Sequence, residues 1–385
     1  MKELSRREEK KVEYLELIYD LIFVYIIGRN NSLLHHTVDG MIAPDMFIAY
    51  ISCTLAVIQI WNFSTYYINI YGQNGLREHI FLFTNMFLLY FIGNATHANA
   101  EIYHTQYHVA WALILLNTAL QYVFEMNNRI REGWNARIVF TLVTEALLVL
   151  AAIPVFKKTG VDISIVPILF GIIATIIPSK GRAQSSINID FAHLSERAML
   201  YVVFTFGEMV IAISSYFNGE ISFNFVYFAL SAFLIVVGLF LSYGTFYDRI
   251  IDREQENNGL WYMLIHIFII FAMNNITTSL EFMQDVEIEL MPKLGFLIGS
   301  FLIFFIFLFM LLGFAKLTCR PPLKFYLKFT LLSVGFIALM LLFRENMRVN
   351  IAISVVYVFS VYGVIYKIGR INSGAVSCKK RINAE

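Results

Sequence analysis

The sequence predicts an all-α polytopic membrane protein that crosses the bilayer about twelve times. Of its 385 residues, 58% are hydrophobic and 15% are charged, whereas soluble domains contain about 45–50% apolar and about 25% charged residues. The apolar residues also gather in runs of membrane-crossing length, and the Lys and Arg residues between the runs favour alternate loops. A bilayer explains all three observations, because lipid contacts apolar side chains and basic loops stay on the cytoplasmic side.

Twelve apolar runs are candidates for membrane-spanning helices, each of which requires roughly 20 residues. We interpret the first run as an uncleaved helix, because no small-residue cleavage site follows Leu21–Ile27. The sixth run is short and ends at Pro178. The runs are residues 16–36, 45–71, 79–98, 105–126, 136–156, 162–178, 194–216, 223–247, 259–281, 293–315, 324–343 and 349–369.

Positive charges between the runs predict the topology. If the N-terminus is cytoplasmic, the cytoplasmic segments contain most of the Lys and Arg residues between the runs, whereas the opposite loops at 37–44, 99–104 and 217–222 contain none. The positive-inside rule then places both termini in the cytoplasm. An error of one span would spoil this alternation, so the loop charges support an even number of spans.

The even number of runs divides the chain into a first six-helix half at residues 1–190, a second half at 191–370 and a basic cytoplasmic tail at 371–385. Two halves that enter the membrane in the same orientation would be parallel repeats. A shift of 180 residues aligns Glu16 with Glu196, but apolar helices also match one another by chance. A repeat and an unrepeated single membrane domain are therefore both open.

Acidic residues inside the apolar runs are the first candidates for function. Glu16 and Asp20 are four residues apart and share one helix face. There they require a cation, an arginine or a shared proton, unless both lie among solvated headgroups. Glu208, beside Gly207, falls about 16 Å beyond Arg197 at the helical rise, near mid-bilayer. A carboxyl at that depth faces a cavity or a partner, or is a neutral acid in a helix interface.

Further polar residues accompany these acids. Glu145 is the other deep acid and has the same two interpretations as Glu208. The others lie toward the cytoplasmic ends of their predicted helices, where they are candidates for an interfacial site. They are His193, Glu196, Arg197, Asp248, Arg249 and His266.

Two acidic motifs carry a resemblance to a known family. The first span opens with ELIYDLIFV, and the seventh pairs Glu196-Arg197 with Gly207-Glu208. Over most of residues 12–275 the chain resembles the bacterial low-temperature-requirement A family, although Ile18 replaces an aromatic residue usual in the first motif. The resemblance implies a multi-pass protein of the bacterial inner membrane, linked by name to growth in the cold, and supplies no molecular activity. The other positions that carry it are Trp61, Asn69, Arg77, Tyr247, Asp248, Arg249 and His266.

Five histidines fall on the side opposite the cytoplasm in this topology. They admit a metal or proton-sensing cluster, but we expect interfacial hydrogen bonding and neither a metal nor a cofactor. The three cysteines lie far apart without metal-ligand spacing, so we expect free thiols. The five histidines are His35, His36, His97, His104 and His108.

The sequence favours transport over catalysis. It contains no Gly-rich phosphate loop, GxSxG or HExxH motif, which argues against an ATP-driven pump. The net charge of +1 gives no indication of a nucleic-acid partner. Beyond the lipid bilayer we therefore expect an ion or small solute as partner, moved by a secondary transporter or channel through intramembrane carboxylates. A membrane-embedded enzyme or accessory factor acting on lipid or envelope intermediates, and a structural or sensory protein, are the alternatives.

Overall fold

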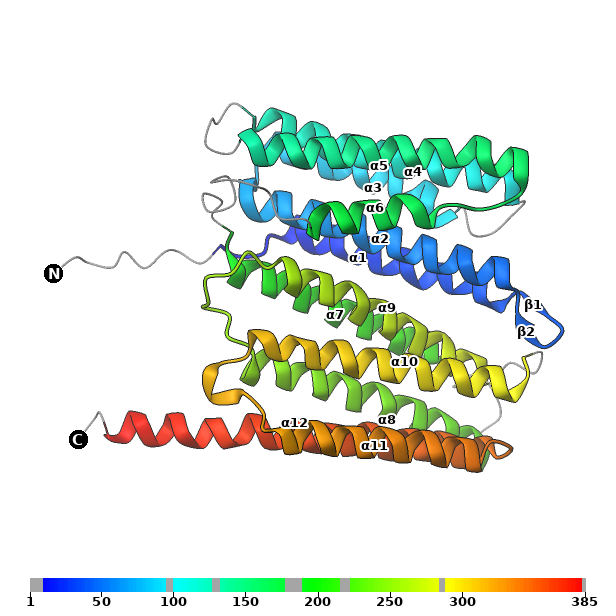
Figure 1. Ribbon diagram of the computed structural model, residues 1–385, viewed down its shortest axis with the longest axis vertical. Helices are drawn as coiled ribbons and strands as arrows, with labels where there is room; N and C mark the ends of the chain where they lie inside the picture. The colour runs from blue at the N-terminus through cyan, green and yellow to red at the C-terminus, as the bar shows by residue number, and fades with distance from the viewer. Residues whose placement is uncertain are drawn as a thin grey trace. The chain divides into compact units, whose positions relative to one another are not determined.

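The computed structural model describes residues 10–94, 100–126, 132–176, 189–214, 222–283 and 288–382. Within these residues the regular secondary structure is helical apart from one short antiparallel hairpin, β1 (Thr37–Val38) and β2 (Met41–Ile42), and an isolated bridge between Ile251 and Ala315, which confirms the predicted all-α class. The helices, shown in Figure 1, are α1 (Tyr14–Asn30), α2 (Pro44–Tyr71), α3 (Leu76–Asn94), α4 (Ala100–Phe124), α5 (Glu132–Thr159), α6 (Ile165–Ile176), α7 (Phe191–Ala212), α8 (Phe223–Thr245), α9 (Leu260–Phe282), α10 (Leu290–Met310), α11 (Leu323–Leu342) and α12 (Met347–Ile382).

Each of the twelve apolar runs contains one of these helices, but several ends differ from the prediction. The first run is broken after Asn30, where a 3₁₀-helix, η1 (Asn31–His35), replaces the α-helix. The eighth run ends in a π-helix, η4 (Phe246–Ile250), and α12 continues through residues 371–382, which we had assigned to a separate tail. The remaining short segments are the 3₁₀-helices η5 (Leu311–Phe314) and η6 (Leu317–Cys319).

Among the described residues, eight helices are long and apolar enough to cross a membrane. α6 has only 12 residues, which span about 18 Å, less than the roughly 30 Å of a hydrocarbon core. α1, α3 and α7 do not meet the same criterion of length and composition. The eight are α2, α4, α5, α8, α9, α10, α11 and α12.

The chain forms two compact units. The first contains the residues up to His36 together with Ala43–Tyr201 and Glu254–Met263. The second contains Thr37–Ile42, Val202–Arg253 and the residues from Leu264 onward. The boundary thus falls within α7 and again within α9. In the first unit α1 contacts α2 and α3, and α5 contacts α4 and α6; in the second unit α12 contacts α8 and α11.

Apolar side chains are exposed along whole helix faces, as a bilayer requires. On α3, Ile80, Phe83, Phe87 and Tyr90 are each more than half exposed and lie three or four residues apart. A soluble protein rarely exposes an apolar patch of this kind. The polar residues of the first unit are instead buried between its helices, where the candidate site lies.

Candidate functional site

Six polar or aromatic side chains from α1, α2 and α7 meet inside the first unit, and we call them the Arg197 network. The helical period brings them together, because the two members on α1 and the two on α7 are each four residues apart. Asp20, Trp61 and Arg197 are 0% exposed, and the other three are at most 5% exposed. The members are Glu16, Asp20, Trp61, Asn69, His193 and Arg197.

Arg197 lies between the two acids of α1. Its Nη2 donates a hydrogen bond to Asp20 Oδ1, and its Nε lies 3.3 Å from Glu16 Oε2. Asp20 Oδ1 also accepts a hydrogen bond from Trp61 Nε1 at 2.7 Å. The Trp61 ring stacks on Tyr201, with ring centroids 4.3 Å apart. The Asp20 carboxylate is therefore held by one guanidinium and one indole in a site without water-exposed surface.

The hydrogen bonds around His193 fix its tautomer. The backbone N–H of Asp190 donates to Asn69 Oδ1 at 3.1 Å, and the carbonyl of Asp190 accepts from Asn69 Nδ2 at 2.8 Å, which sets the orientation of the amide. Asn69 Nδ2 then faces His193 Nδ1 at 3.0 Å and can only donate, so Nδ1 carries no proton. The ring proton is on Nε2, which lies 3.6 Å from Glu16 Oε2.

The charges of the Arg197 network do not balance. Two carboxylates, Glu16 and Asp20, face one guanidinium, and the imidazole of His193 adds no charge in the tautomer just described. Glu16 Oε2, Asp20 Oδ2 and Arg197 Nη1 have no hydrogen-bond partner among the described residues. The network itself therefore carries one net negative charge and spare acceptor oxygens, a combination that takes up a proton or a cation. The Lys10 ammonium attracts Glu16 from outside the network, across the hollow that both residues line.

A polar hollow of about 350 Å³ leads to this network. Glu16 lines it, and Lys10 closes one side by donating to the carbonyls of Ile68 and Gly72 at the end of α2. Burial lowers the pKa of the Lys10 ammonium below its ordinary value of 10.5, and the Glu16 and Glu78 carboxylates offset part of this shift. The hollow connects the Arg197 network to solvent at the N-terminal end of α1.

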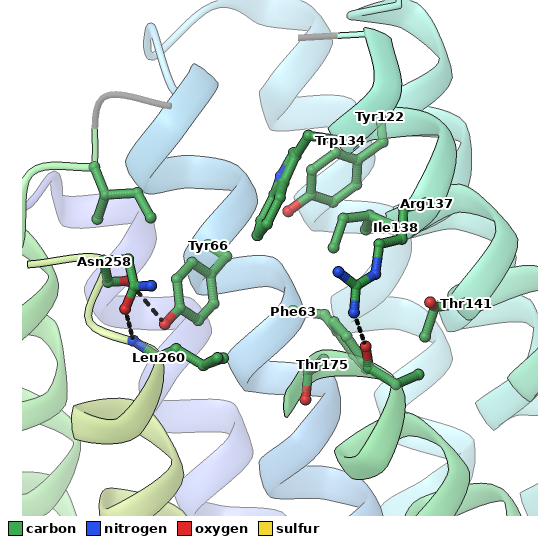
Figure 2. Close-up of a pocket in the computed structure, with 12 residues that line it drawn as sticks. Phe63, Tyr66, Tyr122, Trp134, Arg137, Ile138, Thr141, Thr175, Asn258 and Leu260 are labelled. Carbon is green, nitrogen blue, oxygen red and sulfur yellow. Dashed lines mark hydrogen bonds between the residues drawn. The ribbon is translucent and has the colours of Figure 1, made fainter. Parts of the chain in front are cut away.

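A second hollow in the first unit is smaller and more apolar, with a volume of about 60 Å³ (Figure 2). Trp134, Tyr122 and Tyr66 supply aromatic walls, and Tyr66 donates to the carbonyl of Asn258 at 3.3 Å. Arg137 Nη2 donates to the carbonyl of Ala174 at 2.6 Å. Its guanidinium thus caps the end of α6 beside this hollow.

The other two deep acids lie outside the Arg197 network. Glu145 is fully buried on α5, and neither carboxyl oxygen has a hydrogen-bond partner among the described residues. It packs against α6 at Gly171, where an added Cβ would overlap Glu145 Oε2 and Gln59 Nε2. Glu208 belongs to the second unit, is half-buried and lies near Glu281. An added Cβ at Gly207 would meet no atom within 4 Å, so no close helix contact is made there.

Three of the predicted interfacial residues lie in the second unit. His266 is buried, and its Nε2 lies 3.0 Å from the hydroxyl of Tyr243. Asp248 and Arg249 are exposed on the π-helix η4, and the Arg249 guanidinium lies 5.2 Å from the centroid of the Tyr366 ring. None of these contacts includes a member of the Arg197 network.

Two residues of the first unit also lie apart from the Arg197 network. Glu196 is half-buried beside Arg197. Arg77 forms a surface ion pair with Glu125 at the start of α3, and its guanidinium lies 5.7 Å from the centroid of the Phe124 ring. Neither is positioned to act on Glu16 or Asp20.

Sequence reasoning missed three residues that build the network. Asp190 caps α7, because its Oδ1 accepts from the backbone N–H of His193 at 3.0 Å, and an Asp just before a helix is a recognisable N-cap signal. Tyr201 follows Arg197 by four residues, a spacing that places both on one face. Lys10 had no such signal, because nothing in its local sequence indicates that it reaches the end of α2.

Comparison with known proteins covers almost the whole described chain. A family model for the bacterial low temperature requirement A protein (LtrA) matches residues 11–361. No curated protein and no solved structure matches the chain. The matched residues include all members of the Arg197 network.

Proposed function

The chain belongs to the bacterial low temperature requirement A protein family and is an integral membrane protein, and from this premise we propose that it is a proton-coupled secondary transporter or channel. Glu16 and Asp20 together bind one proton, and Arg197 holds the remaining negative charge. Protonation and release at this pair change the charge of the buried site and couple proton movement to that of a small solute.

The observation that carries the proposal is the charge imbalance of the Arg197 network. Two carboxylates sharing one guanidinium repel each other, and a shared proton relieves that repulsion. The pair Glu16 and Asp20 offers few oxygen atoms, whereas a bound metal cation such as Ca²⁺ takes six to eight oxygen ligands. A proton therefore suits this site better than a larger ion.

Access to bulk water supports the same function. Glu16 lines the polar hollow at the start of α1, whereas Asp20 lies one helical turn deeper and has no exposed surface. Glu16 exchanges its proton with the hollow first, and its protonation state sets how strongly Arg197, which lies between the two acids, holds the Asp20 carboxylate. A network that served only to lock helices together would be satisfied by one carboxylate for one guanidinium.

We further propose that all twelve helices cross the inner membrane, with both termini in the cytoplasm. The loop charges support this topology, and the hollow beside Glu16 then opens to the cytoplasm. The division at residue 190 and a two-fold repeat remain proposals of the same kind.

A membrane enzyme acting on lipid is the second candidate, and the apolar hollow in Figure 2 favours it. Its aromatic walls and the nearby Arg137 resemble a site for an amphiphile. However, about 60 Å³ is room for roughly two water molecules. This volume does not accept a lipid chain, so we rank this candidate below transport.

Proton flux into liposomes tests the proposal. The purified protein is reconstituted with a pH-sensitive dye inside, and a potential is imposed with and without a panel of small solutes. We expect the wild type to acidify the lumen and both Glu16→Gln and Asp20→Asn to abolish this flux. Arg77→Gln, which removes a surface ion pair and a contact with the Phe124 ring outside the Arg197 network, is the matched control and should transport normally.

The Glu208→Gln variant distinguishes this proposal from the alternative that Glu208, the acid predicted near mid-bilayer, carries the proton. We expect it to keep most of the flux, because Glu208 lies outside the Arg197 network. Loss of flux in Glu208→Gln with normal flux in Glu16→Gln and Asp20→Asn would overturn the proposal. Size-exclusion elution of each variant verifies that lost flux does not come from misfolding.

A further inference from the structure

A second cluster of titratable side chains lies at the other end of the first unit. His104 and His108 are one turn apart near the start of α4, and Asp162 lies in the connection between α5 and α6. Because successive helices run in opposite directions, this end is opposite the start of α1, where the polar hollow lies. We call these three residues the His–Asp cluster.

The His–Asp cluster has the spacing of metal ligands. One ligand atom from each residue lies within 4.8 Å of the others, and His104 Nε2 is 3.5 Å from Asp162 Oδ1. Tetrahedral zinc ligands at bond lengths of about 2.0–2.1 Å are about 3.3 Å apart. The widest separation must therefore close by about 1.5 Å, which requires the stacked His104 and His108 rings, 25° from parallel, to open.

Surrounding hydrogen bonds already orient two of the three ligands. His108 Nδ1 donates to the carbonyl of His104 at 2.7 Å, so the unprotonated Nε2 faces the Ser164 hydroxyl at 2.7 Å, a contact that must loosen when a metal ion binds there. Metal-binding histidines commonly donate their other ring N–H to a backbone carbonyl in this way. Asp162 Oδ1 accepts from the backbone N–H and the hydroxyl of Ser164, which fixes the orientation of the carboxylate with Oδ1 toward His104.

His104 provides an independent observation. Its side chain is 9% exposed, and neither ring nitrogen has a hydrogen-bond partner among the described residues. The ring is held between His108 and Phe156, with centroids 3.9 Å and 4.0 Å away. Within the described part of the chain, Nδ1 has no partner and Nε2 has only the Asp162 carboxylate 3.5 Å away, which is unfavourable for a buried imidazole. A metal ion would satisfy Nε2.

We propose that His104, His108 and Asp162 bind one divalent transition-metal ion of the Zn²⁺ class. Two neutral imidazoles and one carboxylate carry a single negative charge and suit zinc better than Mg²⁺ or Ca²⁺, which prefer oxygen ligands. Ser164 is a positioning residue, because its hydroxyl contacts both His108 Nε2, at 2.7 Å, and Asp162. Three protein ligands leave a fourth position open, and the partly exposed Asp162 provides the way in.

The bound ion would join two segments of the first unit. α4 supplies both histidines, and the connection between α5 and α6 supplies the aspartate. The ion thus fixes the start of the short helix α6 against α4. Binding should therefore stabilise the folded protein, because the unfolded chain holds no such ligand set.

Metal binding is measured on the full chain in detergent, purified with a histidine-free affinity tag and stripped with a chelator. We expect one Zn²⁺ per chain by calorimetry, a rise in the melting temperature, and visible absorption bands of tetrahedral Co²⁺ when cobalt replaces zinc. His104→Ala and Asp162→Ala should weaken Zn²⁺ binding by about 100-fold or more, and Ser164→Ala by about tenfold.

His79→Ala is the matched control, because this histidine contacts Asn74 at the opposite end of the unit and should leave Zn²⁺ affinity unchanged. The Ser164→Ala variant and the Co²⁺ spectrum of the wild type keep the test valid if a ligand variant fails to fold. The proposal is overturned if the wild type binds no zinc. It is equally overturned if folded His104→Ala and Asp162→Ala keep the wild-type affinity.

Discussion

Arg197 is the residue on which the first unit depends most, because its guanidinium is the positive charge bonded to Asp20 and near Glu16. Replacing Arg197 with Gln leaves Asp20 buried without a counter-charge and leaves Glu16 with only the Lys10 ammonium nearby. Removing one partner of a buried pair lowers stability by about 3–5 kcal/mol. We expect Arg197→Gln to lower the free energy of unfolding by this amount, measured in detergent by denaturant titration followed with circular dichroism.

A double variant tests whether charge, and not lost packing, is the cause. Asp20→Asn in the Arg197→Gln background restores the net charge of the wild-type site. The double variant should therefore be more stable than the sum of the single effects predicts, by about 1–3 kcal/mol. Strict additivity would show that the Asp20–Arg197 contact carries no coupling energy.

A substitution at Trp61 measures the contribution of its hydrogen bond to Asp20 to stability separately from that of its aromatic packing. Trp61→Phe keeps an aromatic ring against Tyr201 but removes the Nε1 donor, and a hydrogen bond to a charged group contributes about 1.5–3 kcal/mol. We expect a loss of that size in the free energy of unfolding. Trp111→Phe is the matched control, because Trp111 is equally buried and its Nε1 has no hydrogen-bond partner among the described residues; an equal loss there would contradict this explanation.

At the scale of elements, α6 packs closely against its neighbours at one glycine. A methyl group at Gly171 would overlap Gln59 and Glu145, and overpacking of a core lowers stability by about 1–3 kcal/mol. We expect Gly171→Ala to lower the melting temperature accordingly. Gly335→Ala on α11, where an added Cβ meets no atom within 4 Å, should be neutral or stabilising by up to about 1 kcal/mol.

Helix positions were predictable from the sequence, whereas most partners of the polar residues were not. Hydrophobic runs mark helices because every residue facing lipid is apolar, and the spacing of Glu16 and Asp20 placed them on one face. The identity of their partner depends on how α7 packs against α1. Asp20 and Arg197 are 177 positions apart in the sequence, and nothing local signals that contact. Only the family resemblance, which includes the motifs of both α1 and α7, suggested that the acids of α1 act together with Arg197.

The deepest acid predicted from the sequence, Glu208, is not a member of the Arg197 network. Glu208 was the leading candidate because eleven residues separate it from Arg197, yet it lies outside the Arg197 network. The helical period explains this, because eleven residues are about three turns and the 1.5 Å rise carries the carboxyl about 16 Å away. The His–Asp cluster was missed for a related reason: His104 and His108 were recognised, but Asp162 comes from another element. His97 lies outside the described residues.

At the scale of the whole molecule, the number of crossings is the main open quantity. α3 and α6 are not among the eight helices that meet the criterion of length and composition. If both cross as the loop charges predict, the loop after α5 lies on the opposite side from the loops after α2 and η4. If α3 stays on one side, the loop after α5 moves to the side of the loop after α2.

Cysteine labelling in intact cells decides between these topologies. In a background with the three native cysteines replaced by serine, exposed positions are changed one at a time: Gln73→Cys after α2, Lys158→Cys at the end of α5, and Glu256→Cys after η4. We expect a membrane-impermeant maleimide to label Lys158→Cys alone, and all three after the cells are opened.

Labelling of Gln73→Cys and not Lys158→Cys would mean that the orientation in the membrane is the inverse of the proposed one. The same result for both would mean that an even number of helices crosses between them, so α3, α4 and α5 would not all span. If Glu256→Cys matched Lys158→Cys, one of α6, α7 and α8 would not cross, and the 12-residue α6 is too short to do so as a regular helix.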